Sequence, residues 1–176
     1  SGAVTATVDN ANAATFTIGT GATTVNTDGA GTLTVNGDAG GTAALTIQGG
    51  DADTGDVTVA DYESTGTLTL GNSLNAGAVA ITTKGTGGRT IALGTSADVT
   101  SRAVTSSSLA DGQTLTLTGD KAVTLTSGDA DLAVGAYSGA VTATVDNANA
   151  ATFTIGTGAT TVNTDGAGTL TVNGDA

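Results

Sequence analysis

The sequence contains no cysteine, histidine, proline, methionine or tryptophan among its 176 residues. Without cysteine and histidine the chain lacks thiol nucleophiles, the most common general base and the usual ligands of transition metals. It also carries only four basic side chains against sixteen acidic ones, for a net charge of −12. Such a charge repels nucleic acids and anionic membranes. We therefore expect a protein that is not an enzyme, binds no nucleic acid and does not insert into a membrane.

What the sequence does contain is an exact repeat. Residues 1–39 recur letter for letter as residues 138–176. The chain thus consists of one complete repeat unit, residues 1–137, followed by the start of a second identical unit, residues 138–176. Tandem repetition builds length, valency or a lattice, whereas a single catalytic site gains nothing from being copied without variation. We expect a function that depends on repetition.

Short runs in which threonine alternates with an aliphatic residue occur along most of the chain. They are residues 4–8, 15–18, 32–35, 45–47, 57–59, 67–70, 114–118 and 122–126. A period of two with many β-branched residues is typical of β-strands with one buried face. Clusters of Gly, Asn and Asp between the runs favour turns. The pattern predicts an all-β protein with essentially no helix.

The spacing of these runs suggests a coil. Positions inside successive runs recur at an interval of about 23 residues at Leu45, Leu68, Ile91 and Thr114, and less strictly at Leu33, Val57 and Val79. Two strands per coil of about 23 residues predict a β-solenoid with parallel ladders about 4.8 Å apart. Six such coils would match the repeat unit and advance it by about 29 Å. The register is irregular between residues 95 and 110, where we expect an insertion or a change of sheet.

The alternative fold is a series of tandem β-sandwich adhesin domains. Strands every 8 to 12 residues are equally typical of sandwiches, and the Asn36-Gly37 and Asp28-Gly29 pairs are typical of hairpin turns. The absence of tryptophan and proline, together with uniformly small core residues, favours the narrow interior of a solenoid. Both folds stay open at this point.

Several stretches resemble a known class of proteins. They are GTLTVNG at residues 31–37, GTLTLG at 66–71 and TGATTVNTDGAGTLTVNG at 20–37. These strings are similar to the coils of repetitive bacterial cell-surface β-solenoid proteins: filamentous-haemagglutinin-like adhesins, autotransporter passengers and S-layer-like repeats. The resemblance spans nearly the whole chain and is one of composition. It implies an exported, non-enzymatic protein located extracellularly, at the bacterial cell surface.

Two functions fit these expectations. The first is a structural protein whose units associate with one another into an extracellular filament, sheath or S-layer-like structure. The second is the stalk or repeat region of a giant bacterial adhesin, for which a carbohydrate or a host surface would be the partner. Neither function needs a cofactor, and calcium is the one ion that the sequence leaves as a candidate.

The calcium candidate is a short acidic segment. Asp51, Asp53 and Asp56 alternate with small residues, as in the opening of an EF-hand loop, where carboxylates converge on one hard cation. The bidentate glutamate of such loops is missing, because Tyr62 occupies its position. Asp129 and Asp131 form a shorter version of the same pattern. The competing interpretation for each segment is a solvated acidic turn.

Four further expectations concern packing. Phe16 and its copy Phe153 lie on the aliphatic face of a strand and should pack in the core, whereas Tyr62 and Tyr137 lie in turn-rich segments and should be half-buried. Residues 106–108, three consecutive serines, predict a polar loop. Residues 135–139, at the junction of the two units, predict an ordinary turn inside the solenoid.

Overall fold

The computed structural model describes residues 2–37, 41–49 and 55–174, which form β-strands and the turns that join them. The strands are β1 (Val4–Val8), β2 (Ala14–Thr17), β3 (Thr23–Thr27), β4 (Leu33–Asn36), β5 (Leu45–Gly49), β6 (Val57–Tyr62), β7 (Thr67–Leu70), β8 (Ala78–Gly85), β9 (Arg89–Ala92), β10 (Ser101–Leu109), β11 (Thr114–Thr118), β12 (Val123–Ser127), β13 (Asp131–Ala133), β14 (Val141–Val145), β15 (Ala151–Thr154), β16 (Thr160–Thr164) and β17 (Leu170–Asn173). Helices long and apolar enough to cross a membrane are absent from these residues.

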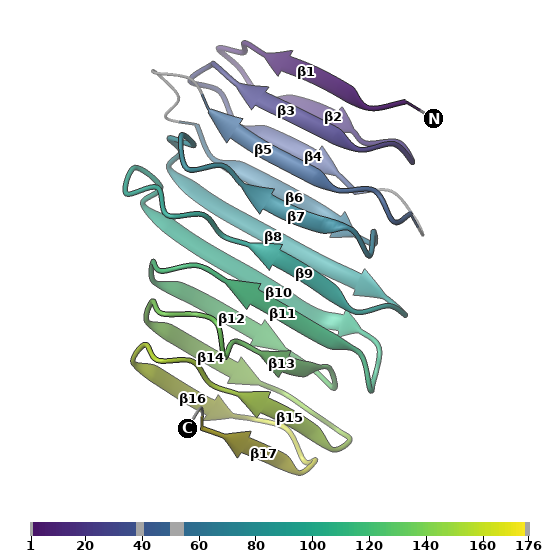
Figure 1. Cartoon of the computed structure of the whole chain (residues 1–176), viewed down its shortest axis with the longest axis vertical. Helices are drawn as coiled ribbons and strands as arrows, with labels where there is room; N and C mark the ends of the chain where they lie inside the picture. The colour runs from purple at the N-terminus through teal and green to yellow at the C-terminus, as the bar shows by residue number, and fades with distance from the viewer. Residues whose placement is uncertain (1, 38–40, 50–54, 175–176) are drawn as a thin grey trace.

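The strands stack into two parallel sheets that face each other (Figure 1). Odd-numbered strands form a nine-stranded sheet and even-numbered strands an eight-stranded sheet, each in sequence order. One strand from each sheet makes a coil, so the chain is a β-solenoid of about eight coils. Because every pairing between the described strands is parallel, the sandwich alternative is wrong. In Figure 1 front strands run leftward and rear strands rightward as the chain descends, so the coil is right-handed.

The number of residues per coil varies, and its mean is smaller than the predicted value of about 23. Among the paired residues of neighbouring coils, Thr114 and Asp131 are the closest in sequence, and Arg89 and Leu115 are the furthest apart. The first unit contains thirteen strands, β1 to β13, before the copy of β1 begins at β14. The unit at 1–137 therefore spans six and a half coils, with a mean length of about 21 residues per coil. The prediction that a unit spans a whole number of coils is wrong.

The predicted register is confirmed in the first half of the chain. Leu45, Leu68 and Ile91 stack in one sheet, and Leu33, Val57 and Val79 stack in the other. The next predicted position, Thr114, is wrong, because Leu117 is the residue that pairs with Ile91. The cause lies between residues 93 and 113, where a long loop and the nine-residue strand β10 lengthen the coil.

The core lies between the sheets and consists of the alternate, inward-facing residues of each strand. Most are Val, Leu, Ile or Ala, whose size suits a thin interior. Phe153 is completely buried, but Phe16 is only half-buried because it belongs to the first coil, which is covered on one side only. Tyr62 and Tyr137 are also completely buried, so the expectation of half-buried tyrosines is wrong.

The serine run does not form a loop. Residues 106–108 lie within β10, where a bulge shifts the pairing with β8. Ser106 points inward and its hydroxyl lies 3.0 Å from that of the buried Ser127. The predicted polar loop is wrong, because the two inward-facing hydroxyl groups satisfy each other.

Candidate functional site

The predicted calcium residues are only partly placed. Asp51 and Asp53 lie outside the described residues. Asp56 is exposed, and its Oδ1 accepts the backbone N–H of Ala78 at 2.7 Å, in the next coil. Within residues 2–37, 41–49 and 55–174, no three carboxylates are grouped so as to hold a metal ion. A calcium site at Asp51, Asp53 and Asp56 therefore stays a prediction.

The shorter acidic pattern connects two coils. Oδ1 of Asp129 accepts the backbone N–H groups of Ala148 and Asn149, both at 2.7 Å. Oδ1 of Asp131 accepts the N–H of Thr152 at 2.7 Å. The hydrogen bonds from Asn149 and Ala148 hold the pKa of Asp129 below its usual value, since they favour the ionised form. Both carboxylates belong to the end of the first unit, and all three N–H groups belong to the second copy.

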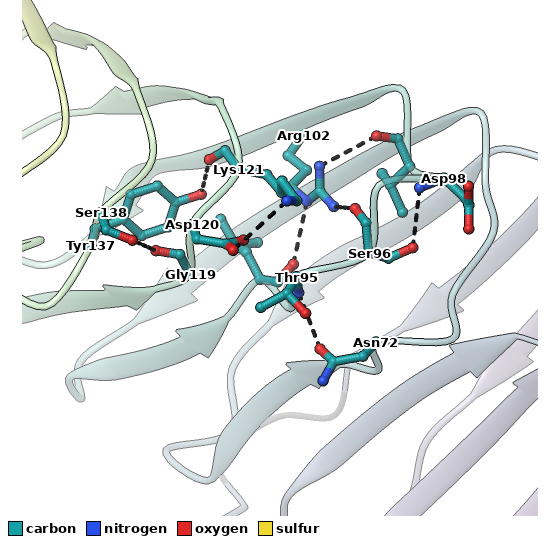
Figure 2. Close-up of polar contacts among 12 residues, drawn as sticks. Asn72, Thr95, Ser96, Asp98, Arg102, Gly119, Asp120, Lys121, Tyr137 and Ser138 are labelled. Carbon is teal, nitrogen blue, oxygen red and sulfur yellow. Dashed lines mark hydrogen bonds and ion pairs between the residues drawn. The ribbon is translucent and has the colours of Figure 1, made fainter.

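A second set of contacts surrounds the point where the second copy begins, as Figure 2 shows. The buried hydroxyl of Tyr137 donates to the carbonyl oxygen of Lys121 at 2.5 Å. Its neighbour Ser138, the first residue of the second copy, donates its backbone N–H to the carbonyl of Gly119 at 3.0 Å. A Cβ at Gly119 would lie 2.9 Å from Cε2 of Tyr137, so this close approach requires glycine. The junction at residues 135–139 is therefore a turn packed against the preceding coil.

Burial sets the ionisation of Tyr137. Loss of water around the phenol disfavours the charged form and raises its pKa to about 12. Arg102 acts in the opposite direction by favouring the phenolate, but with a smaller effect. Tyr137 is therefore neutral near pH 7 and serves as a hydrogen-bond donor.

Arg102 stabilises the long loop that precedes β10 (Figure 2). Its guanidinium group is buried and donates to three backbone carbonyls, of Leu93 at 3.3 Å, Val99 at 3.3 Å and Ser96 at 2.5 Å. Burial lowers the pKa of Arg102, because the charged group is withdrawn from water. All three nitrogens of the guanidinium are engaged by the loop backbone, so this side chain fixes a turn.

Arg89, in the preceding strand β9, has the same role at the turn between β8 and β9. Its Nε donates to the carbonyl of Tyr62 at 3.2 Å, and a terminal nitrogen donates to that of Lys84 at 2.5 Å. Sequence reasoning missed both buried arginines. Their spacing in the sequence could have indicated their burial. Arg89 lies two positions before Ile91, and Arg102 lies two positions before Val104, so each arginine shares the inward face of its strand.

Two grooves on the surface are lined in part by Arg89 and by Asp129. One, of about 550 Å³, is lined by residues that include Glu63, Thr65 and Arg89. The other, of about 740 Å³, is lined by residues that include Asp129 and Asp146 of neighbouring coils. Asp129 already accepts hydrogen bonds from the next coil, and all three nitrogens of Arg89 already donate to backbone carbonyls. These polar groups therefore hold coils and turns together.

The carboxylates of Asp129 and Asp131, the phenol of Tyr137 and the backbone of Gly119 form what we call the junction site. The two carboxylates and the carbonyl of Gly119 bind backbone N–H groups of the second copy, and the phenol of Tyr137 anchors the last residue of the first unit to the preceding coil. No protein-family model, curated protein or solved structure matches this chain. The resemblance to bacterial surface proteins therefore stays a prediction, and the geometry of the junction site is what bears on function.

Proposed function

We propose that this protein is a non-enzymatic structural protein whose tandem units form one continuous β-solenoid rod. The rod would be the core of an extracellular filament, sheath or S-layer-like surface structure. The observation that carries this proposal is the pairing of β14 with β12 over five consecutive residue pairs, with no linker between the units. Each unit then extends the rod, as stacking does in other repeat proteins.

The ends of the described solenoid support the same proposal. Val4 in β1 and Val172 in β17 are the exposed large hydrophobic residues, each 48% exposed. Their equivalents inside the rod, Val141 and Val35, are 2% and 0% exposed. Adding coils at either end would bury these side chains and would pair the open strand edges, which otherwise invite aggregation. The sequence thus favours a long rod over a short one.

The adhesin stalk remains the second candidate, and the net charge favours it. A chain with a net charge of −12 repels its neighbours at neutral pH, which favours separate rods over bundles. Divalent cations would reduce that repulsion. The two candidates therefore differ in whether rods associate laterally and in whether calcium promotes the association.

Electron microscopy of a chain carrying four consecutive units tests the proposal, with samples in calcium and in EDTA. Ordered fibres or sheets of parallel rods support the structural role. Isolated rods in both conditions support the stalk. A string of compact beads joined by flexible linkers would overturn the continuous rod and the structural role proposed for it. A variant with Asp51, Asp53 and Asp56 changed to Asn distinguishes calcium bound at that segment from general screening of charge.

A further inference from the structure

The two copies of the repeated segment lie in opposite sheets. β1 belongs to the nine-stranded sheet, whereas its sequence copy β14 belongs to the eight-stranded sheet. The same exchange holds for β2 and β15. Figure 1 shows β1 in the front layer and β14 in the rear layer. The exchange follows from the odd number of strands in the unit, because thirteen strands end the unit half a coil out of phase.

From this exchange we propose that the open edge formed by β1 and β2 is the packing surface for the β12–β13 end of a preceding unit, and that each unit is rotated by half a turn about the rod axis relative to the one before it. The partner is thus another copy of this same repeat. This inference rests on the proposed tandem rod. It adds to that rod a rotation of half a turn between successive units, which a tandem rod does not require.

The packing between the two units of this chain gives the contacts of that surface. β14 lies on β12 and β15 lies on β13, with Leu132 paired to Phe153. In the first copy, the equivalent Phe16 is half-buried and Val4 is 48% exposed, since nothing covers them from the N-terminal side. The apolar part of the surface is therefore complementary to the end of a unit.

The polar part of the surface matches as well. The N–H groups of Ala148, Asn149 and Thr152 are bound by Asp129 and Asp131. Their equivalents in the first copy are those of Ala11, Asn12 and Thr15, which are exposed residues of the first coil. A preceding unit would present its own two carboxylates to these three donors. Charged acceptors give the strongest backbone hydrogen bonds, so they fix the register of the contact.

The half turn has a measurable consequence. Six and a half coils at about 4.8 Å advance the rod by about 31 Å per unit, and the same face recurs only after two units, about 62 Å. Any side chain of the unit is therefore displayed on both faces of the rod in alternation. The predicted advance of about 29 Å with all copies on one face is replaced by this arrangement.

Pairs of introduced cysteines test the placement of β14 in the full chain, which has no cysteine of its own. Thr124 and Thr142 are exposed cross-strand partners in β12 and β14, and neighbouring strands place Cα atoms within the range that a disulfide spans. If the unit contained a whole number of coils, β14 would lie beside β11 instead. Thr116 and Thr142 are therefore the cysteine pair that this alternative predicts to cross-link. Thr5 and Thr24, partners in β1 and β3, are the positive control.

We expect the T124C/T142C variant to cross-link as readily as T5C/T24C, and T116C/T142C to give at least about tenfold less product. The reverse order would overturn the half turn while leaving a tandem rod intact, so this outcome is separate from failure of the proposed function. A second measurement is hydrogen exchange of the D129A/D131A variant. The amides of Ala148, Asn149 and Thr152 should exchange at least about tenfold faster, and those of β3 to β6 should not change.

D111A, at an exposed turn away from the second copy, is the control for the loss of one carboxylate. Unchanged exchange in D129A/D131A would show that the two carboxylates do not hold the second copy, which would overturn the polar part of the proposed surface.

Discussion

The two copies of the repeated segment have the same sequence and the same local structure, but they differ in burial and in sheet. Asn10 and Asn147 each place Nδ2 near the carbonyl of Thr32 or Thr169, at 3.3 and 3.2 Å. Yet Asn10 lies in the first coil, which is covered on one side only, whereas Asn147 is 1% exposed. The sequence of a segment therefore sets its turns and strands, while the neighbouring coils set its burial and the strand count sets its sheet.

The largest expected difference between the copies concerns the first strand. V141D would place an unpaired charge in the interior and should lower the free energy of unfolding by about 3–5 kcal/mol. V4D changes the same residue in the same local sequence, but at an open edge, and should cost less than about 1 kcal/mol. Urea unfolding of both variants measures the difference. Equal losses would mean that the two copies are equally covered.

A smaller effect concerns Tyr137, which precedes the second copy and has no counterpart before the first in this chain. Its pKa is raised by burial from 10.0 to about 12, so its contribution to stability is complete below pH 10 and is lost as pH rises toward 12. At about 1.4 kcal/mol per pKa unit, the loss is about 2–3 kcal/mol. Unfolding free energies measured between pH 9 and pH 12 give the slope of stability against pH.

The control for that slope is Tyr137→Phe, which removes the titrating group. This variant should be less stable near pH 7, because the hydrogen bond to Lys121 is lost, but its stability should fall less steeply with rising pH. The pKa of Tyr62 is also raised by burial, so Tyr62→Phe in the same background should flatten the remaining slope further. An unchanged slope in Tyr137→Phe would contradict the assignment.

The smallest effect concerns the paired asparagines. Asn147→Ala removes the hydrogen bonds that a buried amide donates to backbone carbonyls, including that of Asn149 at 2.6 Å, and should cost about 1–2 kcal/mol. Asn10→Ala removes the equivalent bonds in an exposed coil and should cost less than about 0.5 kcal/mol, because water replaces them. Thermal unfolding of the two variants provides the comparison. A larger loss for Asn10→Ala would contradict it.

Alternation of threonine with aliphatic residues was sufficient to predict an all-β protein, because inward and outward positions follow directly from a period of two. The interval of about 23 residues between strands favoured a solenoid but left the sandwich open. The stacks through Leu45 and Leu68, and through Leu33 and Val57, were predictable from that same interval. The whole-coil unit was not, since it depends on the count of strands. β13 has only three residues, Asp131–Ala133, too short for its alternation to stand out, and it is the strand that makes the count odd.

The candidate site was predictable only in part. The short spacing of Asp129 and Asp131 was a visible acidic pattern, but the sequence could not tell that backbone N–H groups of the next coil bind these carboxylates. The serines at 106–108 interrupt the alternation of polar and aliphatic residues that would reveal a strand, because the bulge in β10 shifts the register there. Such features depend on contacts between coils, which a single sequence does not display.

The most direct test of the half-turn arrangement is imaging of a chain of four consecutive units with one small gold cluster per unit. The label would be attached to a cysteine at the position of Thr5 and Thr142, which is exposed in both copies. The account predicts labels on alternate sides of a thin rod, about 31 Å apart along the axis and about 62 Å apart on each side. Labels along one side only, about 29 Å apart, would contradict it.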